Sequence, residues 1–130
     1  MSAELTYLTY TTLLTGLLWV PYILNMITVR GLLPAMGYQD NPKPMAAWAV
    51  RLKAAHYNAV ENLVLFAVVV LIVEIRDIGS ATTALACLIY FLARVVHVVS
   101  YTFKIPYVRT LSFAIGFISV LVIASQILMG

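Results

Sequence analysis

The sequence predicts an all-α integral membrane protein built as a bundle of four transmembrane helices. Of its 130 residues, 63% are hydrophobic and only 10% are charged, and its mean hydropathy is +0.99. A soluble domain is about half apolar and about a quarter charged. Because one spanning helix needs about 20 residues, the chain accommodates four helices with short connections. We therefore expect a single transmembrane domain over residues 1–130.

Four apolar stretches give the expected helices, at about 5–29, 46–75, 80–103 and 107–129. Pro21 should kink the first helix, because proline has no amide hydrogen to donate to the preceding turn. Glycine, asparagine and proline residues predict an irregular loop over 31–44. The first stretch is about twice as long as a signal-peptide core, so we expect it to be retained as a helix.

Basic residues set the expected orientation. They gather around the first and third connections, whereas the middle connection has only Arg76 beside two acidic residues, and the amino end carries only Glu4. The positive-inside rule then places the first and third connections in the cytoplasm and both termini on the outer side. The multi-pass chain would present the polar ends of its helices to the cytoplasm.

Two full charges, Glu61 and Arg94, lie inside apolar segments, where each costs at least about 2.5 kcal/mol. Glu61 lies 15 residues after Ala46, about 22 Å along its helix, and Arg94 lies ten residues before Lys104, about 15 Å along its own. These depths are similar, and a pair is far less costly than two lone charges. We therefore predict a Glu61–Arg94 ion pair. Its role is either to fix the register of the two helices or to form the floor of a binding pocket.

Polar residues share one face on each of two helices, at steps of seven and three residues on the second and three and four on the third. They are Arg51, Asn58 and Glu61 on the second helix and Arg94, His97 and Tyr101 on the third. If the two faces meet, they form a hydrophilic pocket at the cytoplasmic rim. Its guanidinium, imidazole, phenol and amide donors suit an anionic or zwitterionic ligand with carboxylates.

Other functions fit these residues less well. The basic residues form no stripe, so no nucleic-acid partner is expected. His56 and Glu61 are five residues apart, which is the wrong spacing for one helical metal face, so no metal site is expected. His97 alone would be an interior histidine, and Tyr101 has an alternative role at the membrane interface. Cys87 has no partner for an intrachain disulfide.

Small residues on two of the expected helices suggest close helix packing, either within the bundle or between subunits of an oligomer. They are Ser112, Gly116 and Ser119 on the fourth helix and Gly16 on the first.

Two motifs resemble those of the MAPEG family, membrane-associated proteins in eicosanoid and glutathione metabolism. The stretch from Arg51 to Glu61 resembles the family signature, roughly Arg-x-x-x-Ala-His-x-Asn-x-x-Glu. The stretch from Arg94 to Tyr101 resembles the second motif and is followed by Pro106 and Arg109, as the family pattern expects. The resemblance covers nearly the whole chain and is to bacterial-type members, which implies the bacterial inner membrane.

The resemblance implies a homotrimer with three sites between neighbouring subunits, where glutathione binds as cosubstrate in a bent form. Arg109 would be the catalytic residue, because a guanidinium favours the nucleophilic thiolate. Arg30 loosely matches a basic residue at the end of the first helix, and Thr110 keeps the hydroxyl of a serine found in some members. The remaining glutathione contacts implied by the family are Asn58, Glu61, His97 and Tyr101.

The leading hypothesis is a membrane-bound glutathione transferase or peroxidase that acts on a lipophilic electrophile entering from the bilayer. The mammalian glutathione-using members carry arginines where this chain has Ala54 and Tyr57, although Arg51 and Lys53 could partly replace them. Because of that departure, the alternative remains that the protein has the MAPEG fold but binds another ligand or serves as a scaffold. A small proton-coupled drug exporter ranks lower, because Arg94 would hold Glu61 ionised and repel cations.

Overall fold

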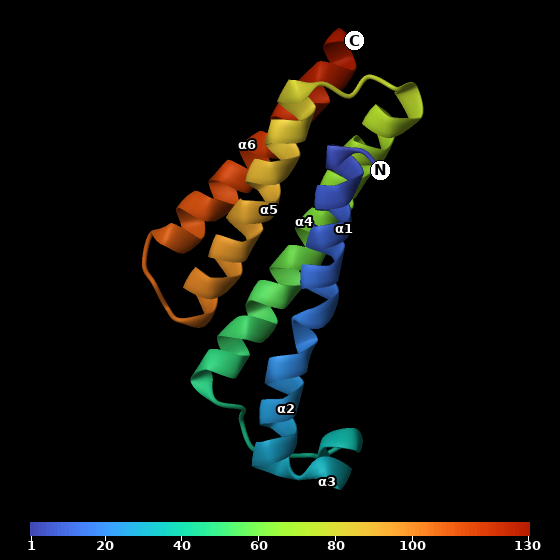
Figure 1. The fold of residues 1–130 in the computed structure, drawn as a ribbon. Helices are drawn as coiled ribbons and strands as arrows, with labels where there is room; N and C mark the ends of the chain where they lie inside the picture. Colours follow the sequence, from blue (N-terminus) through green and yellow to red (C-terminus); the bar gives the residue numbers. More distant parts are fainter.

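The computed structural model describes residues 1–130 and is entirely helical outside its connections (Figure 1). Its helices are α1 (Ala3–Leu17), α2 (Trp19–Arg30), α3 (Leu32–Met36), α4 (Ala47–Arg76), α5 (Ala81–Thr102) and α6 (Val108–Met129). Four segments are long and apolar enough to cross a membrane, with α1 and α2 together forming the first. The predicted all-α, four-span membrane architecture is confirmed.

The first span breaks where proline was expected to bend it. Helix α1 ends at Leu17 and α2 begins at Trp19, because Pro21 cannot donate to the Leu17 carbonyl and its ring crowds that carbonyl. Around the break, the Leu18 amide donates only to the Thr15 carbonyl, at 3.4 Å.

The expectation of an irregular loop over 31–44 was wrong for its first part. Leu32–Met36 forms the short helix α3. Gly31, with a φ of 87°, lets the chain turn between α2 and α3, a conformation that a side chain would disfavour.

Helix α5 is the centre of the bundle and packs against α1, α4 and α6. In an apolar stretch of 18 residues of this helix, 44% of residues are buried by the chain itself, against 17% in the corresponding stretch of the first span. The α6 face towards α5 contains buried Ser112, Gly116 and Ser119, so the small-residue prediction holds there. Gly16 is exposed and has no atom near the position of an added Cβ, so it does not pack against another helix of its own chain.

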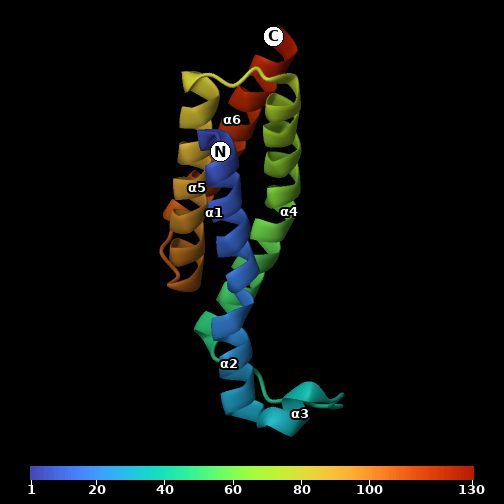
Figure 2. The ribbon, with the colours of Figure 1, turned by 45° about the vertical axis from the view of Figure 1, so that its right-hand side comes forward.

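Helices α2 and α3 form an arm that extends past the connection between α5 and α6 in both views (Figures 1 and 2). Two polar contacts attach this arm to α4. The Tyr22 hydroxyl and His56 Nδ1 are hydrogen-bonded at 2.8 Å, and Asn25 Oδ1 accepts from the Ala46 amide at 2.9 Å. Both termini and the α4–α5 connection lie at the opposite end of the molecule (Figure 1).

Candidate functional site

A polar cavity of about 300 Å³ lies where α5 turns into α6 and meets the first part of α4. Three cationic side chains, two phenols and two aliphatic hydroxyls contribute to its walls, and no carboxylate does. The lining residues are Arg51, Ser100, Tyr101, Lys104, Ile105, Pro106, Tyr107, Arg109 and Thr110. Such a wall attracts an anion and offers it several hydrogen-bond donors.

The turn that forms this cavity has an unusual backbone. Lys104 has a φ of 57° and Tyr107 a φ of 68°, a left-handed conformation that residues with side chains rarely adopt. Both residues line the cavity. Backbone strain of this kind gathers at binding sites, where the surrounding fold holds it in place.

Arg109 and Arg51 approach the cavity from α6 and α4. The Arg109 guanidinium carbon lies 4.7 Å from the centroid of the Tyr101 ring, a cation–π contact that fixes its position. Arg51 Nε donates to the Thr102 carbonyl at 2.9 Å, so this residue ties α4 to the last turn of α5. The hydrogen bond uses only Nε, and the two terminal nitrogens remain available to a ligand.

A second polar layer lies deeper in the bundle. Arg94 is only 2% exposed, and its Nη2 donates to Asn58 Oδ1 at 2.8 Å, which joins α5 to α4. His97, also 2% exposed, stands edge-on to Tyr101 with ring centroids 5.7 Å apart. His97 therefore contacts a wall of the cavity from one turn above Arg94 on α5.

This deeper layer is not fully paired within the chain. Arg94 Nε and His97 Nδ1 are buried and form no hydrogen bond with another protein group. Buried polar atoms without partners are rare in folded proteins, so these two nitrogens are candidates for ligand contacts.

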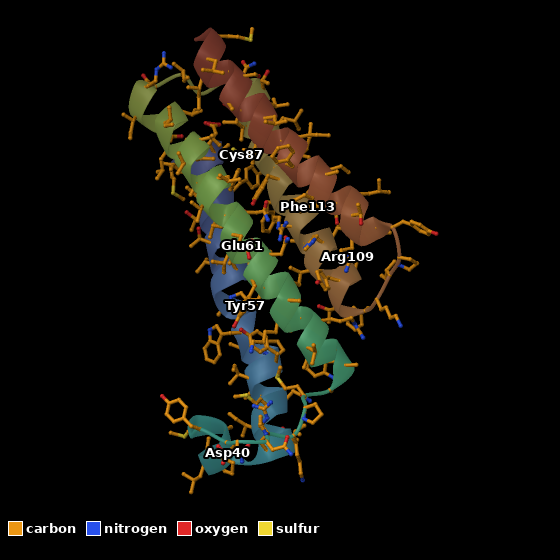
Figure 3. All side chains as sticks on the ribbon, turned by 180° about the vertical axis from the view of Figure 1, so that it is seen from behind. Asp40, Tyr57, Glu61, Cys87, Arg109 and Phe113 are labelled. Carbon is orange, nitrogen blue, oxygen red and sulfur yellow. The ribbon has the colours of Figure 1, made fainter.

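The predicted Glu61–Arg94 ion pair was wrong for the single chain. Glu61 is exposed and lies midway along α4 (Figure 3), while Arg94 binds Asn58 instead. The reason is the geometry of α4. Glu61 follows Asn58 by three residues, which is about 60° short of a full helical turn, so the two side chains point in different directions. With Asn58 directed at α5, Glu61 lies to one side of the contact.

The other predicted site residues divide into two groups. Arg51, Tyr101, Arg109 and Thr110 line the same cavity, and their roles in binding or catalysis stay predictions. Arg30 does not, because its Nε donates to the Lys43 carbonyl at 2.7 Å on the arm formed by α2 and α3. Figure 3 shows the distance of this arm from the cavity, because Asp40, which follows α3, lies well away from Arg109.

Five lining residues were not predicted: Ser100, Lys104, Ile105, Pro106 and Tyr107. Four of them belong to the connection between α5 and α6, where only Pro106 was noted, as part of the family pattern, and where Tyr107 was expected to begin the fourth helix although that helix begins at Val108. The one available signal was Lys104, a cation three residues after Tyr101 and five before Arg109.

Loss of the Asn58 amide should destabilise the bundle. We expect Asn58→Ala to lower the free energy of unfolding by about 2–3 kcal/mol, because it leaves the buried Arg94 guanidinium without its acceptor. Detergent-denaturation curves of the purified protein measure this change, with Asn41→Ala in the exposed loop as the matched control. The double variant Asn58→Leu with Arg94→Met should recover stability, and a single Asn58→Ala variant as stable as wild type would contradict the account.

Comparison with known proteins gives one match. The family model described as MAPEG family matches residues 7–129 of this chain, which includes every residue of the cavity and of the deeper polar layer. No curated protein and no solved structure matches the chain. Membership supports a membrane function related to glutathione, or one based on the same fold. The match spans nearly the whole sequence, and the chain belongs to the MAPEG family.

Proposed function

We propose that this protein is a membrane-bound glutathione transferase, which uses the same thiolate for peroxidase activity on lipophilic hydroperoxides. The observation that carries the proposal is the cavity in which Arg51, Lys104 and Arg109 meet and no carboxylate is present. Glutathione has two carboxylates and a thiol, so its charge complements these walls. A cationic site at a helix end next to lipid suits a reaction in which polar glutathione arrives from the aqueous phase and the lipophilic substrate arrives from the bilayer.

In this proposal Arg109 acts on the sulfur. Its guanidinium, held against the Tyr101 ring, stabilises the thiolate after the thiol proton has left to solvent. The thiolate attacks the electrophilic carbon of the second substrate, a carbon–sulfur bond forms, and the leaving group departs with its electron pair. With a hydroperoxide, two glutathione molecules become one disulfide while the hydroperoxide is reduced to an alcohol and water.

Arg51 and Lys104 then hold the carboxylates of glutathione. They compensate for Ala54 and Tyr57, which occupy positions where mammalian relatives have arginines. Lys104 lines the cavity together with Arg51, so the compensating charge comes from the α5–α6 connection rather than from α4 alone. Thr110 and Tyr101 supply hydroxyls, and His97 with the Asn58–Arg94 pair forms the floor.

We further propose a homotrimer in which a neighbouring chain covers part of α4. Six exposed residues recur on this helix at steps of four and three, the spacing of a coiled-coil seam. They are Tyr57, Glu61, Val64, Val68, Leu71 and Ile75. A carboxylate facing lipid at this depth is costly. A neighbouring subunit that pairs with Glu61 would remove this cost and would explain why a glutamate stands on the exposed face of α4. Arg30 would likewise act across the interface.

The proposed orientation has both termini outside and the cavity facing the cytoplasm of a bacterial inner membrane. It rests on the basic residues around the α5–α6 connection and the start of α4, which lie together at the end opposite both termini (Figure 1). Positive residues favour the cytoplasmic side. Cytosolic glutathione would then reach the cavity directly.

A MAPEG-fold protein with a different anionic ligand is the second candidate, favoured by the absence of arginines at positions 54 and 57. A proton-coupled exporter needs a carboxylate without a cationic partner, and Glu61 has no such partner within the chain. Drug-dependent proton release that Glu61→Gln abolishes would favour export. The cationic walls of the cavity argue against a cationic drug as ligand.

Removal of the Arg109 guanidinium should abolish thiolate formation while binding persists. We expect glutathione bound to wild type to show thiolate ultraviolet absorbance at neutral pH, and Arg109→Ala to lose it. Conjugation of a generic electrophile should fall at least about 100-fold, as when one stabilising donor is removed from an anionic intermediate. Arg109→Lys should retain part of both signals.

The matched control is Arg76→Ala, because Arg76 is exposed and donates to the Ile127 carbonyl at the other end of the bundle. It should conjugate as wild type does. A wild-type protein that neither binds glutathione nor conjugates the electrophile would remove the transferase proposal. Glutathione binding without conjugation would favour the second candidate.

The trimer is tested by a single cysteine on the exposed face of α4. In a Cys87→Ala background, Val68→Cys should form disulfide-linked dimers on mild oxidation, since each bond joins two of the three chains. Ile118→Cys, on the exposed face of α6, should stay uncrosslinked. Native mass spectrometry should give the mass of three chains for both, and a monomer mass would contradict the proposal.

A further inference from the structure

Tyr90 carries a buried hydroxyl that no group of the protein bonds. The residue is 2% exposed, and its oxygen has no hydrogen-bond partner. Its ring stacks on Phe66 of α4 with centroids 3.9 Å apart, and a Cβ added to Gly116 of α6 would lie 3.7 Å from the ring. Because the ring is packed on both sides, the hydroxyl is not free to turn towards another acceptor. A buried hydroxyl without a partner is unfavourable, so we look for its partner outside the chain.

Arg94 offers a second unpaired donor next to this hydroxyl. It follows Tyr90 by four residues on α5, so the two side chains are neighbours on one face of the helix. Its Nε is buried and forms no hydrogen bond, and its charge lies near enough to the Tyr90 hydroxyl for a direct Coulomb interaction. We propose that Arg94 Nε and the Tyr90 hydroxyl bind a small monovalent anion of the chloride class inside the bundle. Neither residue lines the proposed glutathione cavity, so the anion site does not depend on that function.

The charge of Arg94 favours an anion over a neutral partner such as water. A guanidinium stays ionised in proteins, and its one hydrogen-bond partner here is the neutral Asn58 amide. Asn58 Oδ1 also accepts from Asn62 Nδ2 at 3.3 Å, so both of its lone pairs are in use. No carboxylate of the chain bonds to Arg94. A buried cation is costly without a compensating negative charge, and an anion at Nε would supply that charge.

Two other sources of negative charge do not reach this position. A neighbouring subunit cannot bring a carboxylate to Arg94 Nε, because the chain itself already buries that atom. A ligand in the glutathione cavity meets Tyr101 first and then His97, which is 2% exposed and lies between Tyr101 and Arg94 along α5. Because both donors belong to residues that are almost fully buried, the position favours a monatomic ion over a phosphate or a carboxylate.

Thermal unfolding of the detergent-purified protein in different sodium salts tests this site. The chloride, bromide and gluconate salts are compared at matched ionic strength, because the screening of surface charges then stays the same. We expect chloride and bromide to raise the unfolding temperature in a saturable way, as a ligand that binds only the folded state does, and gluconate to have no such effect. Crystals grown in bromide should show one anomalous-scattering peak per chain beside Arg94.

Tyr90→Phe removes the hydroxyl and keeps the ring that stacks on Phe66. It should weaken chloride binding at least about tenfold, the effect of losing one hydrogen bond to a charged group. Tyr10→Phe, at an exposed tyrosine of α1, is the matched control and should bind chloride as wild type does. The double variant Asn58→Leu with Arg94→Met removes the buried charge together with its acceptor, and its unfolding temperature should be the same in all three salts.

Equal unfolding temperatures of wild type in chloride and gluconate overturn the proposal. A chloride effect that persists in the double variant, or a Tyr90→Phe variant with wild-type chloride affinity, overturns it as well, because the two side chains are then not the ligands. The sign of the stability change gives a further check. A Tyr90→Phe variant that is more stable than wild type in chloride contradicts the proposal, since stability rises when an unpaired buried hydroxyl is removed and falls when an anion ligand is removed.

Discussion

Burial of the Arg94 guanidinium is the constraint on which the rest of the molecule depends. This group stays charged in proteins, and it lies inside an apolar bundle with only 2% of the residue exposed. Asn58 on α4 accepts its hydrogen bond, which fixes how α4 and α5 approach each other. The same face of α5 then carries His97 and Tyr101 towards the α5–α6 connection. The cavity therefore lies at the end of α5 towards which this polar face leads.

The two ends of the bundle are chemically opposite. One end gathers arginine and lysine around a cavity without carboxylates, and the other gathers carboxylates around a cavity without cations. The apolar helices between the two ends are long enough to cross a membrane. In the proposed orientation, the basic end faces the cytoplasm.

Much of the fold could be predicted from sequence because membrane helices have a strong compositional signal. The four spans and the break near Pro21 followed from apolar runs and from the missing amide of proline. Within the site, four residues named from the sequence, Arg51, Tyr101, Arg109 and Thr110, line one cavity. These positions lie near helix ends, so whether they meet depends little on how each helix is rotated about its own axis.

The failures have specific physical causes. Depth along a helix does not fix rotation about its axis, so Asn58 rather than Glu61 contacts Arg94. The left-handed conformations of Lys104 and Tyr107 have no sequence signature, because neither residue is a glycine. The acidic cavity could not be predicted because it joins Ser2 to Glu74, 72 residues apart in the chain.

The central claim is that the carboxylates of glutathione bind the cations of the α5–α6 cavity. Affinity of the purified protein for glutathione and for its dimethyl ester, which lacks both negative charges, tests this claim most directly. Because a hydrogen bond to a charged group contributes about 1.5–3 kcal/mol, wild type should bind glutathione at least about tenfold more tightly than the ester. The double variant Arg51→Gln with Lys104→Gln should bind the two ligands equally. Equal affinities in wild type, or a preference that persists in the variant, would contradict the account.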